Sequence, residues 1–98
     1  MIQYALQAHL EAAPGKEKEV EEFLKSALPL VQAETGTAAW FALKVGPGRY
    51  GIFDVFHDEA GRNAHLNGKV AAALMQKADE LFSSPPKIDK IDVLATKL

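Results

Sequence analysis

The sequence predicts a single α+β domain over residues 1–98, with the element order strand, helix, strand, strand, helix, strand. Both end segments alternate between apolar and polar residues, as half-buried strands do. Two longer segments repeat apolar residues at the spacing of one helix face. A Gly-Pro-Gly turn joins two runs rich in aromatic and aliphatic residues, which predicts a β-hairpin. A chain of 98 residues also fits one domain rather than two.

The first predicted strand covers residues 2–11, because its side chains alternate with a period of two. Its polar face includes Gln7 and His9. Its apolar face consists of Ile2, Tyr4, Leu6, Ala8 and Leu10. The Ala13-Pro14-Gly15 segment then ends the strand.

A helical segment follows, with its apolar face at Val20, Phe23, Leu24, Ala27, Leu28 and Val31. Pro29 interrupts this segment, because it lacks the N–H that would bond to the carbonyl of Lys25. We therefore expect either a kink at Pro29 or a fresh turn running to Glu34. Gly36 fits the C-terminal stop of this helix.

The predicted hairpin pairs residues 37–45 with residues 49–57, and the turn is Gly46-Pro47-Gly48. Asp58 can cap a second helix, which is broken at Asn67-Gly68. The continuation of this helix has an apolar stripe of Val70, Ala71, Leu74, Met75, Ala78, Leu81 and Phe82. Ser83-Ser84-Pro85-Pro86 stops the helix, and residues 87–98 form the last strand.

This order predicts the ferredoxin-like split βαβ arrangement, an antiparallel sheet with both helices on one face. The other face of the sheet then needs a cover. We expect the apolar stripe of the first strand, which includes Leu6, to point to that open face. Because such a stripe is unfavourable on a monomer, a homodimer through the open sheet face is predicted.

Composition excludes several classes of protein. The net charge of −2 and the pI near 5.9 argue against a nucleic-acid partner. The chain has no cysteine, so disulfides and thiolate chemistry are excluded. No apolar stretch approaches the roughly 20 residues of a membrane span, and the first residues do not resemble a signal peptide. A cytoplasmic protein without membrane contact is the expectation.

The segment Tyr50-Gly51-Ile52-Phe53-Asp54-Val55-Phe56-His57-Asp58-Glu59-Ala60, followed by Ala64-His65-Leu66, resembles the antibiotic-biosynthesis-monooxygenase family of dimeric α+β barrel proteins. Phe56 stands where the family often has a tryptophan. Haem-degrading relatives carry a histidine ligand at the position of Met75, an asparagine at His9 and a tryptophan at His65, so a haem oxygenase is not expected. The resemblance implies a homodimeric monooxygenase without flavin, haem or metal, acting on an electron-rich phenol, quinol or polycyclic aromatic.

No strong catalytic motif is present, so the candidate catalytic residues are His65, Asp54 and His9. If Asp54 and His65 face one cavity between sheet and helices, the carboxylate could orient the imidazole as a base. The alternative is a structural bridge between strand and helix. His9 and Gln7 share a strand face that we expect to look toward the helices, where they could line a cavity or, for His9, lie in solvent.

Candidate ligand-contacting residues are Trp40, Tyr50, Phe56, Gln7 and Met75, although Trp40 and Met75 fit the core more simply. No metal site is expected, because the spacing of the three histidines gives no support for one. The rival to a monooxygenase is a non-catalytic dimeric module that binds a small ligand or acts in a stress response.

Overall fold

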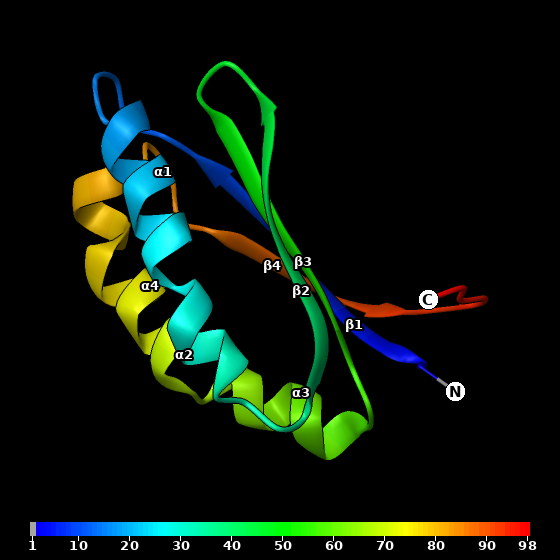
Figure 1. Cartoon of the computed structure of the whole chain (residues 1–98). Coiled ribbons are helices and arrows are strands. Elements are labelled where there is room, and N and C mark those ends of the chain that lie inside the picture. Colours follow the sequence, from blue (N-terminus) through cyan, green and yellow to red (C-terminus); the bar gives the residue numbers. More distant parts are fainter. Residues whose placement is uncertain (1) are drawn as a thin grey trace.

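The computed structural model describes residues 2–98, which form a four-stranded sheet covered on one side by helices (Figure 1). In chain order the elements are β1 (Tyr4–Glu11), α1 (Glu17–Ser26), α2 (Leu28–Gln32), β2 (Thr37–Gly46), β3 (Arg49–Phe56), α3 (Glu59–Leu66), α4 (Lys69–Leu81) and β4 (Lys87–Asp92). The strand order is β2-β3-β1-β4 and every neighbouring pair is antiparallel. The predicted ferredoxin-like α+β fold is therefore confirmed.

Each predicted helix is divided in two, at the positions where the sequence indicates a break. Pro29 lies in the first turn of α2, where its missing N–H has no helical partner to lose. Gly68 is the N-cap of α4 and separates it from α3. The Asp58 side chain caps α3 by accepting a hydrogen bond from the backbone N–H of Gly61 at 2.7 Å.

The β2–β3 turn also has the predicted conformation. Gly48 has a φ of 70°, a value that suits glycine at the third position of a turn whose second residue is Pro47. The last strand is shorter than predicted. It ends at Asp92 rather than at Leu98, although the N–H of Val93 still bonds to the carbonyl of Gln3.

The prediction of which face of β1 meets the helices is wrong. The apolar stripe does not point to the open face. Ala8 and Leu10 pack in the main core against residues of α1 and α4, namely Val20, Leu24, Leu74 and Leu81. Alternation separates the two faces of a strand but does not determine which face packs against the helices. Here the helices cover the face that is apolar along its full length.

The opposite side of the sheet, called here the open face, is apolar in its own right. Cross-strand partners share a face, so the register places Ala5, Ala39, Phe41, Leu43, Phe53, Val55 and Ile91 on it. Phe41 is 52% exposed and Leu43 is 39% exposed. An apolar open face therefore exists, but β2, β3 and β4 contribute most of it.

The loop after α2 crosses the start of α3 at two glycines. A Cβ on Gly36 would lie 2.7 Å from the Cα of Gly61, and one on Gly61 would lie 2.7 Å from the carbonyl oxygen of Gly36. Gly36 has no positive φ, so it is not the left-handed helix stop that the sequence suggested. Glycine is needed at both positions because the two backbones touch.

Gly61→Ala is therefore expected to destabilise the protein by about 1–3 kcal/mol, because the new methyl group meets backbone atoms that must shift. For a domain of this size each kcal/mol lowers the melting temperature by roughly 4–8 °C. Thermal unfolding measures the effect. Asn63→Ala, at an exposed position of the same helix, is the control. Equal melting temperatures for Gly61→Ala and the control would show that the backbones separate without cost.

Candidate functional site

Asp54 is a carboxylate in the protein interior. It lies on β3 opposite Leu6 of β1, so its side chain points to the face of the sheet that the helices cover. Only 1% of the residue is exposed. A buried carboxylate is costly unless another group compensates its charge, so its neighbours decide what it can do.

The compensating group is His65, which α3 brings over the sheet. Its Nε2 lies 2.9 Å from Oδ2 of Asp54, as the sequence predicted for this pair. This contact has the distance of an ion pair but not the angles of a hydrogen bond. Oδ2 of Asp54 therefore has no hydrogen-bond donor within residues 2–98. The imidazole also tilts against the buried ring of Phe56, with the ring centroids 5.3 Å apart.

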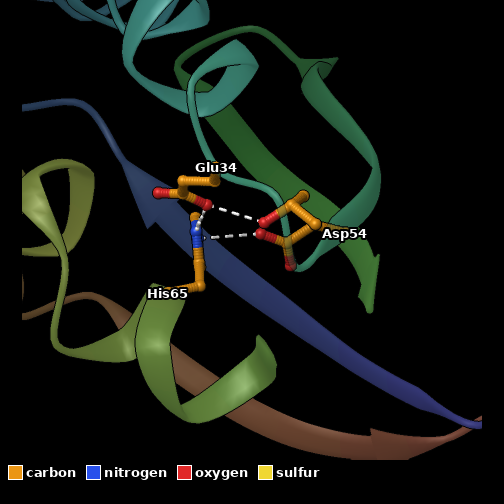
Figure 2. A network of polar contacts seen from close by, with 4 residues as sticks. Glu34, Asp54 and His65 are labelled. Atoms are coloured by element: carbon orange, nitrogen blue, oxygen red, sulfur yellow. Dashed lines mark hydrogen bonds and ion pairs between the residues drawn. The ribbon is translucent and has the colours of Figure 1, made fainter. Parts of the chain in front are cut away.

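A second carboxylate holds the other ring nitrogen. Nδ1 of His65 lies 2.6 Å from Oε1 of Glu34, and Figure 2 shows the imidazole between the carboxylates of Glu34 and Asp54. The hydroxyl of Thr37 donates a further hydrogen bond to the same Oε1 at 2.6 Å. We call Glu34, His65 and Asp54 the carboxylate–histidine cluster.

Sequence reasoning did not identify Glu34 as a site residue. It lies in the loop after α2, where no periodicity marks it, and 31 positions separate it from His65. The close contact of Gly36 with Gly61 brings that loop against α3. The two glycines that make this contact possible did not reveal it, because Gly36 by itself also fits a helix C-terminal stop.

Burial and charge act against each other within the cluster. Burial lowers the pKa of His65, but its contacts with the carboxylates of Asp54 and Glu34 raise it more, so the pKa lies above the ordinary 6.5. Burial raises the pKa of Asp54 above the ordinary 3.8, and the contact with His65 offsets part of that increase. The two carboxylates thus favour the imidazolium form of His65 more than water favours it for a free histidine.

These shifts predict that stability falls as pH rises. A raised His65 pKa means that the folded protein holds a proton more tightly than the unfolded chain does. That contribution is complete below pH 6.5 and is lost as pH rises through the folded-state pKa. The raised pKa of Asp54 acts in the same direction from pH 3.8 upward. Melting temperatures measured across this range should fall above pH 6.5.

The matched comparison uses two histidine variants. His65→Gln should remove the decline above pH 6.5, whereas His9→Gln should keep it, since His9 lies on the opposite face of the sheet and its side chain is 54% exposed. A wild-type profile that stays flat or rises above pH 6.5 contradicts the assignment.

The cluster separates two cavities of different size. The larger one, about 510 Å³, lies between α2, the following loop and the α3–α4 junction. It is lined by Pro29, Leu30, Ala33, Glu34, Thr35, Gly36, Thr37, Gly61, Ala64, His65, Gly68 and Lys69. We call it the outer pocket. The inner cavity, between sheet and helices, measures only about 30 Å³ and is lined by Asp54 and His65 among mostly apolar residues. His65 is the member of the cluster that borders both.

The outer pocket has the volume of a small-molecule site, whereas the inner cavity has room for about one water molecule. A substrate between sheet and helices, as the sequence analysis placed it, does not fit the inner cavity. The candidate ligand site is therefore the outer pocket, with Glu34 and His65 in its wall.

The other polar candidates lie elsewhere. The prediction that Gln7 and His9 look toward the helices is wrong, because the register places both on the side of the sheet away from Ala8 and Leu10. Nε2 of His9 lies 3.6 Å from Oδ2 of Asp89. His9 lines a different surface pocket, near the β2–β3 turn.

The aromatic and methionine candidates do not line the outer pocket. Phe56 is fully buried. Trp40 packs against the main core and against a smaller cluster of Ala27, Val31 and Val70, and its Nε1 has no hydrogen-bond partner within residues 2–98. Tyr50 donates to Glu21 at 2.6 Å, a hydrogen bond that raises the pKa of Tyr50 to about 12. Met75 is 58% exposed, because it lies on the outer side of α4.

Within residues 2–98, no three His, Cys, Asp or Glu side chains are grouped so that they could hold a metal ion. None of the helices in this part of the chain combines the length and apolar character needed to cross a membrane.

Solved structures identify the class of fold. A candidate antibiotic biosynthesis monooxygenase from Nitrosomonas europaea is 14% identical with a TM-score of 0.82, covering 94% of this chain and 90% of that chain. One from Caulobacter crescentus is 18% identical with a TM-score of 0.79, covering 96% and 92%. The chain therefore has the fold of the antibiotic-biosynthesis-monooxygenase proteins, as the resemblance predicted, and at these identities the likeness extends to the fold alone.

A nearer relative shows the family itself. The crystal structure of NE2512 from Nitrosomonas europaea, a protein of unknown function, is 60% identical with a TM-score of 0.97 and covers 100% of this chain and 95% of that chain. The chain belongs to the same family as NE2512. Searches against protein-family models and curated proteins give no match.

Proposed function

We propose that this protein is a cofactor-independent monooxygenase that acts on a small, electron-rich phenol or quinol bound in the outer pocket. The observation that carries the proposal is that His65, which contacts Asp54 at 2.9 Å, lies in the wall of a cavity of about 510 Å³. The fold shared with candidate antibiotic biosynthesis monooxygenases supports the same reaction class.

The reaction needs only acid–base chemistry and orientation from the protein. Loss of the phenolic proton makes an anion that transfers one electron to dioxygen, and the resulting radicals combine to form a carbon–oxygen bond. Return of the phenolic proton gives a hydroperoxide on the ring carbon. Loss of the C–H proton at that carbon, together with cleavage of the O–O bond, then leaves a C=O group and releases water. For a phenol with a free para position, phenol plus O₂ gives quinone plus H₂O, so atoms and electrons balance.

Oxygen consumption tests the proposal. Purified protein, free of added flavin, haem and metal, is mixed with a panel of phenols and quinols, and oxygen uptake is followed alongside product mass. Uptake above the rate of autoxidation, with one oxygen atom incorporated from ¹⁸O₂, is the expected result. No uptake across the panel would contradict a monooxygenase.

A non-catalytic ligand-binding module is the second candidate. The observation that favours it is that carboxylates occupy both ring nitrogens of His65, an arrangement that also serves to tie α3 to β3 and to the α2–β2 loop. In that case phenols should bind without oxygen uptake, and changing His65 should lower stability without altering ligand affinity.

We further propose that the protein is a homodimer through the open face. Phe41 and Leu43 are large, exposed apolar residues of that face, and a patch of this kind is unfavourable in water. A second copy presents the same patch, so a two-fold pairing covers both at once.

A further inference from the structure

We propose that the carboxylate–histidine cluster accepts the ligand's proton as one unit, with Glu34 as the group that touches the ligand. The ligand is then a neutral hydroxyl compound that ionises when it binds in the outer pocket. This inference rests on the proposed function and specifies how its first step occurs.

The placement of the three side chains shows where a proton can enter. The Glu34 side chain is 22% exposed, whereas those of His65 and Asp54 are 8% and 2% exposed. Both ring nitrogens of His65 face carboxylate oxygens, so neither is available to a molecule in the outer pocket. Asp54 does not line that pocket, and Lys69 is the other charged residue that does. Glu34 is the route from the pocket into the cluster.

One oxygen of Glu34 is already occupied and the other is not. Oε1 accepts from Thr37 and contacts Nδ1 of His65, each at 2.6 Å. Within residues 2–98 no hydrogen bond is found to Oε2, which would lie 3.5 Å from a Cβ placed on Gly68, at the pocket wall. Oε2 is thus positioned to accept from a ligand hydroxyl.

The proton balance favours uptake of one proton. With two carboxylates and an imidazolium the cluster carries a charge of −1. When the ligand O–H breaks, an O–H forms at Oε2 of Glu34, and the Nε2 proton of His65 moves to Oδ2 of Asp54. All three groups are then neutral, which a buried site favours. Oδ2 of Asp54 lies 2.9 Å from Nε2 of His65, and no other group in residues 2–98 donates to it, so it can accept that proton.

The experiment uses para-nitrophenol, whose anion absorbs at longer wavelength than the neutral form, with para-nitroanisole as the matched ligand that has no O–H. At a pH where most free probe is neutral, the anion-to-neutral ratio of bound para-nitrophenol should be roughly tenfold higher than in solution, equivalent to one pKa unit. Glu34→Gln should abolish this gain. Para-nitroanisole has no O–H to lose and should not ionise in either protein, so any change in its affinity measures altered packing rather than lost proton transfer. Glu22→Gln, on an exposed part of α1 outside the outer pocket, should keep the gain.

Two further variants distinguish a proton-transfer unit from a single carboxylate. Asp54→Asn should reduce ionisation of the probe although Asp54 does not line the pocket. Thr37→Val should increase it, because the Thr37 hydroxyl donates to Oε1 and so stabilises the carboxylate form of Glu34. Circular dichroism confirms that each variant is folded. The proposal is overturned if para-nitrophenol does not bind, binds without ionising, or ionises equally in Glu34→Gln.

Oxygen uptake, measured separately, distinguishes this inference from the proposed function. Ionisation of para-nitrophenol without uptake on any phenol leaves the proton-accepting unit standing and removes the monooxygenase. Oxygen uptake that depends on His65 but not on Glu34 supports the monooxygenase and contradicts Glu34 as the proton acceptor.

Discussion

Replacing His65 with alanine is expected to lower the rate of oxygen uptake by about 10²–10⁴-fold, the usual contribution of a positioned acid–base group. The imidazole links the two carboxylates of the cluster at 2.6 and 2.9 Å, so its loss separates Glu34 from Asp54. Initial rates at saturating phenol measure the effect, with product identified by mass. The control is His57→Ala, because His57 is exposed and lies outside both cavities.

The same change also removes the charge that compensates Asp54, so lost stability has to be separated from lost chemistry. His65→Ala leaves a carboxylate that is 1% exposed without its partner, a change that costs about 3–5 kcal/mol when a buried ion pair is broken. Combining His65→Ala with Asp54→Asn removes the orphaned charge. The double variant should recover part of the lost stability but none of the oxygen uptake. Recovery of both would mean that the pair is only a structural bridge.

Replacing Leu6 with aspartate is expected to unfold the protein. Leu6 is 4% exposed and lies on the face of β1 that the helices cover. An unpaired charge there costs several kcal/mol, which is comparable with the roughly 5–15 kcal/mol by which domains of this kind are stable. Circular dichroism and chemical denaturation measure the loss. A folded monomer would instead place Leu6 at a subunit interface.

Phe41→Asp is the matched substitution on the open face. Phe41 is 52% exposed in one chain, so an aspartate at this position remains in contact with water in a monomer. Only in a dimer would its charge be buried, at a cost in free energy. We expect a folded monomer, while the wild type sediments as a dimer at micromolar concentration. A wild type that sediments as a monomer, or a Phe41→Asp variant that stays dimeric, excludes the open face as the interface.

The local features of the fold could be predicted from the sequence because each depends on residues adjacent in the chain. Pro29 starts a new helix through its missing N–H, Asp58 caps α3 with a side chain three residues from its donor, and Gly48 supplies the positive φ of a turn. The pairing of Asp54 with His65 belongs to the same class. A strand that enters its helix through a short turn keeps its last residues close to that helix.

Tertiary structure alone decided the remaining features. Alternation along β1 gave two faces, but the packing of α1 and α4 on Ala8 and Leu10 chose which one became the core. The cluster acquired Glu34 because the backbones of Gly36 and Gly61 touch, a contact between segments 25 positions apart that no local pattern encodes. Periodicity and turn chemistry describe how a chain meets its own neighbours. Which distant surfaces meet depends on how the whole chain can bury its apolar residues. Such a long-range contact placed the carboxylate of Glu34 beside His65.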